Sequence, residues 1–130
     1  MQNDCGIYAL LFDDGDVYIG SSATLAVRLA RWDELLSGRG CPQSMARRMK
    51  SKIGCRYRPV ILSRHPCLAT ARYVECLTII NVARSGRPLL NGNASLVGAA
   101  HLFDTQSDWW KRMKADTKLS RDINASLGGR

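Results

Sequence analysis

The sequence has no long apolar run, and none approaches the roughly 20 residues that a transmembrane helix needs. Its first residues, MQNDCGIYALLFDDGD, are acidic and lack the basic start and apolar stretch of a secretory signal peptide. It also lacks internal repeats and low-complexity linkers. We therefore expect a cytoplasmic protein without a membrane span, and its 130 residues fit one domain with a core of its own.

The cysteines lack the close pairs that usually mark metal sites and disulfide frameworks. Their number is odd and no two have CxxC spacing: they are Cys5, Cys41, Cys55, Cys67 and Cys76. One alternative is a zinc site formed by Cys41, Cys55, Cys67 and His65. Reduced thiols that pack as small apolar groups explain the pattern better. The sequence shows no zinc finger and no helix-turn-helix.

The middle of the chain lacks acidic residues, since none lies between Arg39 and Arg72 while that stretch contains nine basic ones. The formal net charge is +8 and is unevenly distributed. Residues 1–38 contain six acids and two arginines, whereas residues 39–130 contain seventeen basic and five acidic side chains. Such one-sided charge is typical of proteins that bind a polyanion, most commonly nucleic acid. Solubility is the other explanation, but it does not require the basic residues to cluster.

Apolar periodicity and turn residues predict an α+β domain with a small antiparallel sheet flanked by helices. Residues 13–16 (DDGD) are a strong turn signal between two short runs rich in β-formers, which predicts a hairpin. Ser21-Ser22 is expected to cap the helix that follows. The expected elements are, in order, strands 5–12 and 17–20, helices 23–36 and 42–52, strand 58–64, and helices 67–84 and 105–118.

Four side chains are candidates for chemistry on the basis of their positions. Tyr8 and Tyr18 lie on the two strands of the hairpin and can converge on one surface. Arg28 is expected near the buried edge of the first helix, where its fork of donors suits a phosphate. Glu75 is expected on a helix that is apolar on nearly every side, where a carboxylate must be paired, protonated or bound to a metal. An ion pair with Arg72, one turn earlier, is the simpler alternative to a metal.

The spaced motif formed by residues 6–8 (GIY) and 18–20 (YIG) resembles the signature of the GIY-YIG nucleases, a family that includes homing endonucleases. The resemblance continues beyond the motif and covers roughly residues 5–93. Arg28 stands eight residues after Gly20, where the family has its catalytic arginine. Glu75 matches the family's metal-binding glutamate, and Asn91 matches the asparagine that closes its core. The resemblance implies a three-stranded antiparallel sheet with flanking helices.

The resemblance also implies a mechanism, in which water attacks the scissile phosphate in line with the leaving oxygen. Glu75 would hold one divalent ion, Mg²⁺ or Mn²⁺, and Arg28 would stabilise charge that develops on the phosphate. Tyr8 would be the general base, directly or through the water, with its pKa lowered by the arginine and the metal. Tyr18 would orient Tyr8 or the water, and Asn91 would support the site.

One position departs from the family pattern. Many members have a histidine or tyrosine one turn after the catalytic arginine, whereas this chain has Trp32. An indole donates one hydrogen bond and cannot take a proton. If that group relays protons elsewhere in the family, this chain works without it, or His65 at the end of the third strand substitutes for it.

Basic residues around the expected core are candidates for contacts with DNA phosphates. They are Arg47, Arg48, Lys50, Lys52, Arg56 and Arg58, with Lys111 and Arg112 near the C-terminus. We expect the segment 39–58 to lie beside the active site. We divide the chain into a catalytic core of residues 1–95 and a basic helical extension of residues 96–130. In the extension Trp109-Trp110 either stacks on bases or packs on the core.

The sequence thus predicts a metal-dependent DNA endonuclease, encoded by a phage or mobile element, that cuts double-stranded DNA as a monomer or as a DNA-induced dimer. Two alternatives keep the same fold. One is a structure-specific repair nuclease that needs a partner subunit, and the other is a DNA-binding module with little catalysis. A protein-interaction domain that uses Trp109-Trp110 is a further alternative, which rests on two residues.

Overall fold

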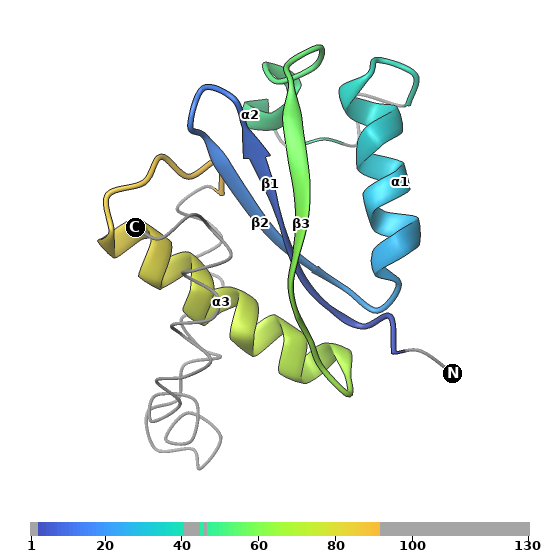
Figure 1. Cartoon of the computed structure of the whole chain (residues 1–130), viewed down its shortest axis with the longest axis vertical. Coiled ribbons are helices and arrows are strands. Elements are labelled where there is room, and N and C mark those ends of the chain that lie inside the picture. Colours follow the sequence, from blue (N-terminus) through green and yellow to red (C-terminus); the bar gives the residue numbers. More distant parts are fainter. Residues whose placement is uncertain (1–2, 41–44, 46, 92–130) are drawn as a thin grey trace.

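The computed structural model describes residues 3–40, 45 and 47–91 of the chain (Figure 1). These residues form an α+β domain with one three-stranded antiparallel sheet in the strand order β2-β1-β3. The elements are β1 (Gly6–Phe12), β2 (Val17–Ser22), α1 (Leu25–Leu36), α2 (Arg47–Lys50), β3 (Tyr57–Arg64) and α3 (Leu68–Arg84). The predicted extension of residues 96–130, with its helix 105–118, Trp109-Trp110, Lys111 and Arg112, lies outside the described residues.

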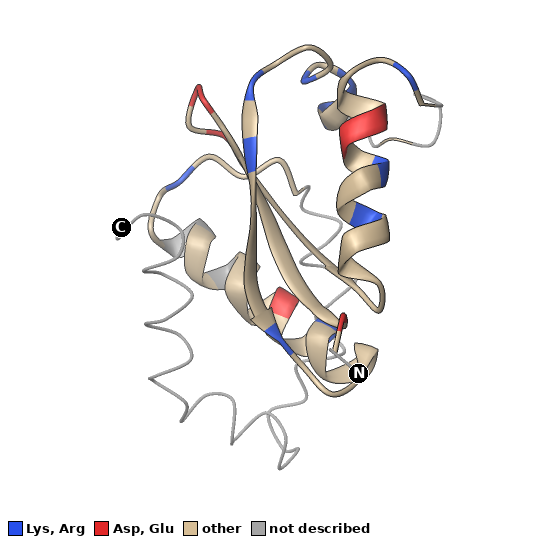
Figure 2. Cartoon of the chain, turned by 45° about the vertical axis from the view of Figure 1, so that its right-hand side comes forward, with Lys and Arg blue, Asp and Glu red and all other residues tan. Residues whose placement is uncertain are grey.

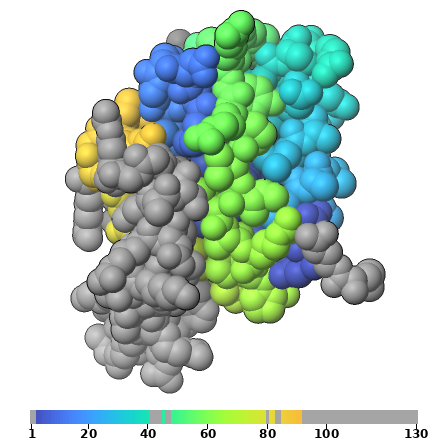
Figure 3. Space-filling model, viewed as in Figure 1, coloured from blue at the N-terminus to red at the C-terminus, as the bar shows by residue number. Residues whose placement is uncertain are grey.

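Helices cover both faces of the sheet, with α1 and α3 on opposite sides (Figure 1). Ile7 and Ile19 lie on one face and pack with Val74 of α3. Tyr8 and Leu10 lie on the other face and pack under α1. Because successive side chains of a strand point to opposite faces, the central strand β1 is buried on both sides. On the surface, α1 lies next to β3 (Figure 3).

The hairpin between β1 and β2 confirms the turn signal, and β2 continues beyond the expected strand, to Ser22. Gly15 has a φ of +98°, a left-handed conformation that glycine adopts without steric cost. The Phe12 amide donates to the Asp16 carbonyl oxygen at 2.9 Å, and the Gly15 amide donates back to the Phe12 carbonyl oxygen at 2.9 Å. These two bonds close the turn.

The pairing of β1 with β3 changes register between Ile7 and Tyr8. A Cβ on Gly6, beside this irregularity, would stand 3.0 Å from the Cα of Arg64 and closer still to a backbone oxygen of β3. Only a glycine allows the two backbones to approach this closely. The first glycine of the GIY motif therefore has a structural reason within this fold.

The first helix begins later than expected and takes its cap from a different residue. It starts at Leu25, and the side chain of its N-cap residue, Thr24, makes no capping bond. Asp4 serves instead, because its carbonyl oxygen accepts from the Leu25 amide at 2.9 Å and its carboxylate from the Ala26 amide at 3.1 Å. Ser22 is occupied in a local turn, in which its Oγ accepts from the Thr24 amide. The expected serine cap was therefore wrong.

The segment expected as helix 42–52 is described only in part, since residues 41–44 and 46 lie outside the described residues. Its regular part is the single turn α2, and the chain leaves it through Gly54, whose φ is +87°. The Gly54 amide donates to the Leu36 carbonyl oxygen at 2.7 Å, which fastens this segment to the C-terminal end of α1. Strand β3 and helix α3 confirm the two elements expected at 58–64 and 67–84.

None of the helices in the described ranges is long and apolar enough to cross a membrane. Four cysteines fall within these ranges and all have free thiols: Cys5 and Cys76 are buried, and Cys55 and Cys67 are exposed. In the same part of the chain, no three His, Cys, Asp or Glu side chains gather as they would around a metal ion.

Candidate active site

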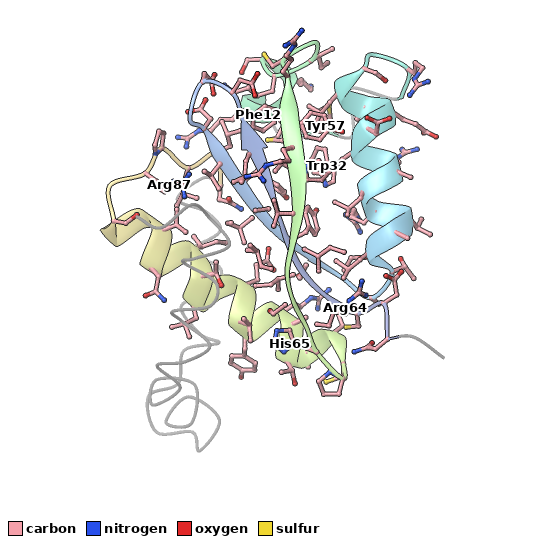
Figure 4. The ribbon with its side chains drawn as sticks, in the orientation of Figure 1. Phe12, Trp32, Tyr57, Arg64, His65 and Arg87 are labelled. Atoms are coloured by element: carbon pink, nitrogen blue, oxygen red, sulfur yellow. The ribbon has the colours of Figure 1, made fainter. Side chains whose placement is uncertain are left out.

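The two tyrosines of the motif lie on the same face of the hairpin, under α1. The register pairs Tyr8 with Gly20 and Leu10 with Tyr18, so both phenols point to that face. Their ring centroids are 6.4 Å apart. Trp32 points from α1 toward the sheet (Figure 4), with its ring 5.2 Å from that of Tyr18. Its Nε1 donates a hydrogen bond of 2.6 Å to the Tyr8 hydroxyl.

Gly20 allows the Tyr8 ring to lie across β2. A Cβ at position 20 would stand 2.5 Å from Cζ and 2.9 Å from Cε1 of Tyr8, and closer still to the hydroxyl oxygen. Gly20 does not have a positive φ, so the close approach of the phenol, not the backbone conformation, requires a glycine here. The last glycine of the YIG motif is thus part of the Tyr8 pocket.

The environment of Tyr8 differs from that expected of a general base. The residue is only 1% exposed. Burial, with a further contribution from Tyr18, raises the pKa of the Tyr8 phenol, although the Trp32 hydrogen bond and the positive charge of Arg28 lower it. The net shift is upward because desolvation disfavours the phenolate more strongly than these groups favour it. Within this chain's own residues, the expected lowering of the Tyr8 pKa is therefore not found.

Arg28 lies on the exposed side of α1, beside the tyrosines. Its positive charge lowers the pKa of both Tyr8 and Tyr18, so the guanidinium is within electrostatic reach of both phenols. Among the residues that the structure describes, this guanidinium makes no hydrogen bond and no ion pair. An arginine held in this way has all its donors available for an anion.

Glu75 is half-buried on the side of α3 that faces the sheet, and its carboxylate reaches β2. Ser21 Oγ donates a hydrogen bond of 2.6 Å to Glu75 Oε2. Burial raises the pKa of the Glu75 carboxyl, while the Ser21 bond and the charge of Arg72 lower it. None of the ion pairs in the described part of the chain joins Glu75 to Arg72. Glu75 and Arg72 therefore form no ion pair in the structure, contrary to the simpler alternative to a metal site.

Ser21 was not among the predicted site residues, although the sequence contains a signal for it. Val17 and Ile19 point to the α3 face of the sheet, and a period of two along the strand places Ser21 on that face as well. The sequence pattern predicts a strand that ends at Gly20, and the alternation of faces along such a strand does not include Ser21. A strand two residues longer would have placed a hydroxyl opposite the α3 helix.

Asn91 holds the outer edge of β2. Ahead of it, the Val17 amide donates to the Pro88 carbonyl oxygen at 2.9 Å, and the Leu90 amide donates to Val17 at 2.8 Å. The Asn91 side chain continues this pairing: Oδ1 accepts from the Ile19 amide at 2.9 Å, and Nδ2 donates to the Ile19 carbonyl oxygen at 2.8 Å. The carboxamide thus replaces a backbone peptide group beside the strand that carries Tyr18. In this arrangement both ends of the Asn91 carboxamide bond to the Ile19 backbone and hold the strand.

His65 does not occupy the position of the missing histidine. It directly follows β3, on the opposite side of β1 from β2, and its Nε2 is 2.7 Å from the Ser63 hydroxyl. Its ring lies toward the start of α3, well away from Trp32 (Figure 4). Burial lowers the pKa of the His65 imidazole, so the ring is neutral at pH 7. Among the described residues, Trp32 is the one whose side chain hydrogen-bonds to the Tyr8 hydroxyl.

The basic residues of segment 47–58 lie toward the end of the sheet that carries the hairpin turn (Figure 2). Arg58 pairs with Leu11, whereas Tyr8 pairs with Ile61. Three residues along a strand correspond to about 10 Å, so Arg58 lies about that far along the sheet from Tyr8, whereas Tyr18, opposite Leu10, is offset from Arg58 by only one residue along the strands. The side chains of Arg48, Lys50, Arg56 and Arg58 are exposed.

Lys52 differs from the exposed basic residues of this segment in being buried and paired. It is only 7% exposed, and its ammonium pairs with the carboxylates of Asp14 and Asp16 in the hairpin turn. The same Nζ lies 5.4 Å from the centroid of the Phe12 ring. The two hydrogen bonds raise the pKa of Lys52. Lys52 is therefore already paired with two carboxylates of the turn, unlike the exposed basic residues of the segment.

Four of the five predicted catalytic side chains lie within electrostatic reach of one another, although the tyrosines lie on the α1 face of the sheet and Glu75 contacts β2 from the α3 side. The charge of Glu75 raises the pKa of Tyr8 and Tyr18, and the charge of Arg28 lowers both. Two phenols, one cation and one carboxylate from the hairpin, α1 and α3 thus share one electrostatic neighbourhood, with Asn91 behind the strand. No family model, no curated protein and no solved structure matches the chain.

Proposed function

We propose that this chain is a metal-dependent endonuclease that hydrolyses DNA phosphodiester bonds with a GIY-YIG arrangement of residues. The observation that carries the proposal is that Trp32 holds Tyr8 and Tyr18 together beneath α1, beside an Arg28 with no ion-pair partner among the described residues, while the half-buried Glu75 carboxylate reaches β2 from α3. A phosphodiester needs a cation that binds its oxygens, a group that orients water, and a carboxylate that can hold a divalent ion. These groups meet here from three separate elements.

Arg28 binds the scissile phosphate in this proposal. Its guanidinium lies beside the phenols without a competing carboxylate partner in the described residues. A planar fork of donors contacts two phosphate oxygens at once and stabilises the negative charge that increases on them in the transition state. Loss of one such donor typically costs about 10²–10³ in rate.

Glu75 is the residue that would hold Mg²⁺ or Mn²⁺. The donor set fits a hard cation held by one carboxylate, with the Ser21 hydroxyl orienting that carboxylate and with substrate phosphate and water as the remaining ligands. Its desolvation is a further reason to pair it with a cation, since burial raises its pKa when no cation is present. When bound, the metal would polarise a phosphate oxygen and supply positive charge that favours loss of a proton from Tyr8 or from water.

Tyr18, which is half-buried, orients the attacking water, and Tyr8, which is buried, packs beside it and fixes its position. Burial raises the pKa of both phenols, so each carries its proton at neutral pH and can donate a hydrogen bond. Trp32 donates to the Tyr8 oxygen at 2.6 Å, which leaves the Tyr8 proton directed away from the indole. The indole also fixes the phenol in one orientation, the function that a histidine or tyrosine would have at that position.

Cleavage of supercoiled plasmid with Mg²⁺ or Mn²⁺ tests the proposal. We expect wild type to nick or linearise the plasmid, EDTA to stop the reaction, and Glu75→Gln and Arg28→Ala to lower the rate about 100-fold or more. Glu34→Gln is the matched control for the loss of a carboxylate, because Glu34 is exposed on α1. A nicked product indicates one site acting alone, and a linear product indicates paired sites. Cleavage at the wild-type rate by Glu75→Gln would refute the proposal.

A second candidate function, a DNA-binding module with little catalysis, is favoured by the sealed, raised-pKa phenol of Tyr8. It predicts that wild type binds the same plasmid or a branched duplex and cuts neither with either metal. Cleavage of branched DNA alone, after addition of a partner subunit, would favour the structure-specific repair nuclease.

A further inference from the structure

A surface hollow of about 410 Å³ lies along the exposed side of α1. Its lining comes from one helix: Thr24, Val27, Arg28, Arg31, Trp32 and Leu35. Two of these residues, Arg28 and Trp32, belong to the site described above. The other basic residue, Arg31, has no part in that site.

The order of the lining residues around the helix follows from the α-helical repeat of about 100° per residue. Trp32 lies at the edge of the stripe nearest the tyrosines, because its indole reaches Tyr8. Arg28 comes next, at about 40° from Trp32, then Arg31 about 60° further, and Val27 at the solvent edge. A ligand that leaves the tyrosines across α1 therefore meets Arg28 first and Arg31 second.

The chemistry of the hollow is that of an anion with an apolar part. Val27 is 66% exposed, which is unusual for a large aliphatic side chain. Arg31 is exposed, and within the described residues it makes no ion pair, not even with Glu34 one turn later. The described lining contains no acidic side chain. Two guanidinium groups without carboxylate partners and an exposed valine match a chain of phosphates joined by sugars.

The direction of the α1 axis also relates the hollow to the basic segment 47–58. The helix begins beside Asp4, at the start of β1, and ends where the Gly54 amide donates to Leu36. Arg31 lies about 4.5 Å further along the axis than Arg28, toward the segment that carries the exposed Arg48 and Lys50. The hollow therefore lies between Tyr8 and the exposed basic residues, and the sheet register places Arg58 about 10 Å along the strand from Tyr8.

We propose that the α1 hollow is the binding path of one DNA strand, in which Arg31 contacts the phosphate next to the one at Arg28. Positions three residues apart on a helix have Cβ atoms about 5–6 Å apart, and long arginine side chains extend that reach to neighbouring phosphates. The sugar that follows the phosphate at Arg31 packs on Val27, at the solvent edge of the hollow. This inference rests on the proposed nuclease function. It assigns Arg31 to binding and not to bond cleavage.

The test measures binding of a fluorescein-labelled 20-base-pair duplex in EDTA, so that no cleavage occurs, as a function of NaCl concentration. Three variants change the net charge equally: Arg31→Ala, Val27→Asp and Ala30→Asp. Ala30 is exposed on the same helix but lies outside the lining of the hollow, which makes Ala30→Asp the matched control. We expect Arg31→Ala and Val27→Asp to weaken binding about tenfold at about 0.1 M salt, and Ala30→Asp less than twofold. The slope of log K against log salt should fall by about 0.9 in Arg31→Ala.

Equal effects of all three variants would overturn the inference, because a general charge effect would then explain them. Wild-type affinity and salt slope in Arg31→Ala would also overturn it, as would failure of wild type to bind the duplex. A protein whose binding depends on Arg31 and Val27 but that cuts no DNA would support the hollow and refute the nuclease. A protein that cuts DNA, but whose Arg31→Ala and Val27→Asp variants bind the duplex normally, would support the nuclease and refute the hollow as a binding path.

Discussion

Replacement of Gly20 by alanine isolates the contact between the two halves of the GIY-YIG motif. The backbone at position 20 has no positive φ, so alanine adds no conformational strain there. The new methyl group would meet Tyr8, 2.5 Å from Cζ and 2.9 Å from Cε1. Tyr8 cannot move aside easily, because it is 1% exposed and its hydroxyl is bonded to Trp32. The ring has to shift within a close-packed core.

The expected cost follows from these contacts. Overpacking of a core by one methyl group costs about 1–3 kcal/mol. Displacement of the phenol also breaks the bond from Trp32 Nε1 to Tyr8, worth about 1 kcal/mol. We therefore expect Gly20→Ala to lower the free energy of unfolding by about 2–4 kcal/mol, which corresponds to roughly 10 °C in Tm for a domain of this size.

Urea denaturation followed by far-UV circular dichroism measures the effect, and Tyr8→Phe identifies its cause. Tyr8→Phe removes the atom nearest the new methyl group, so the double variant should be more stable than the sum of the two single changes by about 1 kcal/mol. Gly54→Ala is the contrasting control: it has open space but a φ of +87°, so it should cost about 1 kcal/mol whichever residue is at position 8. Wild-type stability of Gly20→Ala, or full additivity with Tyr8→Phe, would refute the steric explanation.

Three further predictions concern groups around the site. Asn91→Ala removes both bonds to the Ile19 backbone, so it should lower the free energy of unfolding by about 2–3 kcal/mol in urea denaturation; an unchanged midpoint would mean that these bonds are not formed. Lys52→Met should destabilise the protein at pH 7 without weakening duplex binding. The ammonium of Lys52 lowers the pKa of the Asp14 carboxyl below its ordinary value of 3.8, so this stabilisation is present above that value and is lost as the pH falls through the native pKa. The stability curves of wild type and Lys52→Met should therefore converge in acid, and a constant difference would contradict the ion pair. Burial lowers the pKa of His65 below 6.5, so neutral His65 contributes stability that is complete above about pH 6.5 and declines as the pH falls through its native pKa. Wild type should consequently lose more stability than His65→Gln between pH 7 and pH 5, and parallel curves would contradict this assignment.

The fold was largely predictable because its signals are local. A turn of the type DDGD between two β-rich runs determines a hairpin, and α3 is a long apolar run between breakers. The cap of α1 was not predictable in this way. Asp4 lies far from Leu25 in sequence and reaches its amide only because β1 and α1 start at the same end of the domain.

The sequence could predict which residues form the candidate site, but not how deeply they are buried or in which direction the pKa of Tyr8 shifts. The resemblance indicates Tyr8, Arg28 and Glu75, and in the structure the charges of Arg28 and Glu75 reach the Tyr8 phenol. The burial of Tyr8 and Glu75 depends on the packing of two helices against one sheet, which no local pattern contains. For the same reason the sequence suggested an activated Tyr8, whereas burial dominates the pKa of that phenol.

Lys52 illustrates the limit for surface charges. It belongs by sequence to a run of basic residues, and all of them look equally suited to phosphate. Its partners, Asp14 and Asp16, come from the hairpin turn nearly forty positions earlier. Only the return of the chain past that turn distinguishes this buried ammonium from its exposed neighbours.

The most direct test of the central claim is the single-turnover rate of cleavage of a labelled duplex, measured with saturating protein and Mn²⁺, so that differences in binding do not enter. The account predicts that wild type cuts, and that Arg28→Lys and Glu75→Gln bind the duplex within about threefold of wild type while cutting at least about 100-fold more slowly. Absence of cleavage by wild type on plasmid, linear and branched DNA, or equal rates in wild type and Glu75→Gln, would contradict it.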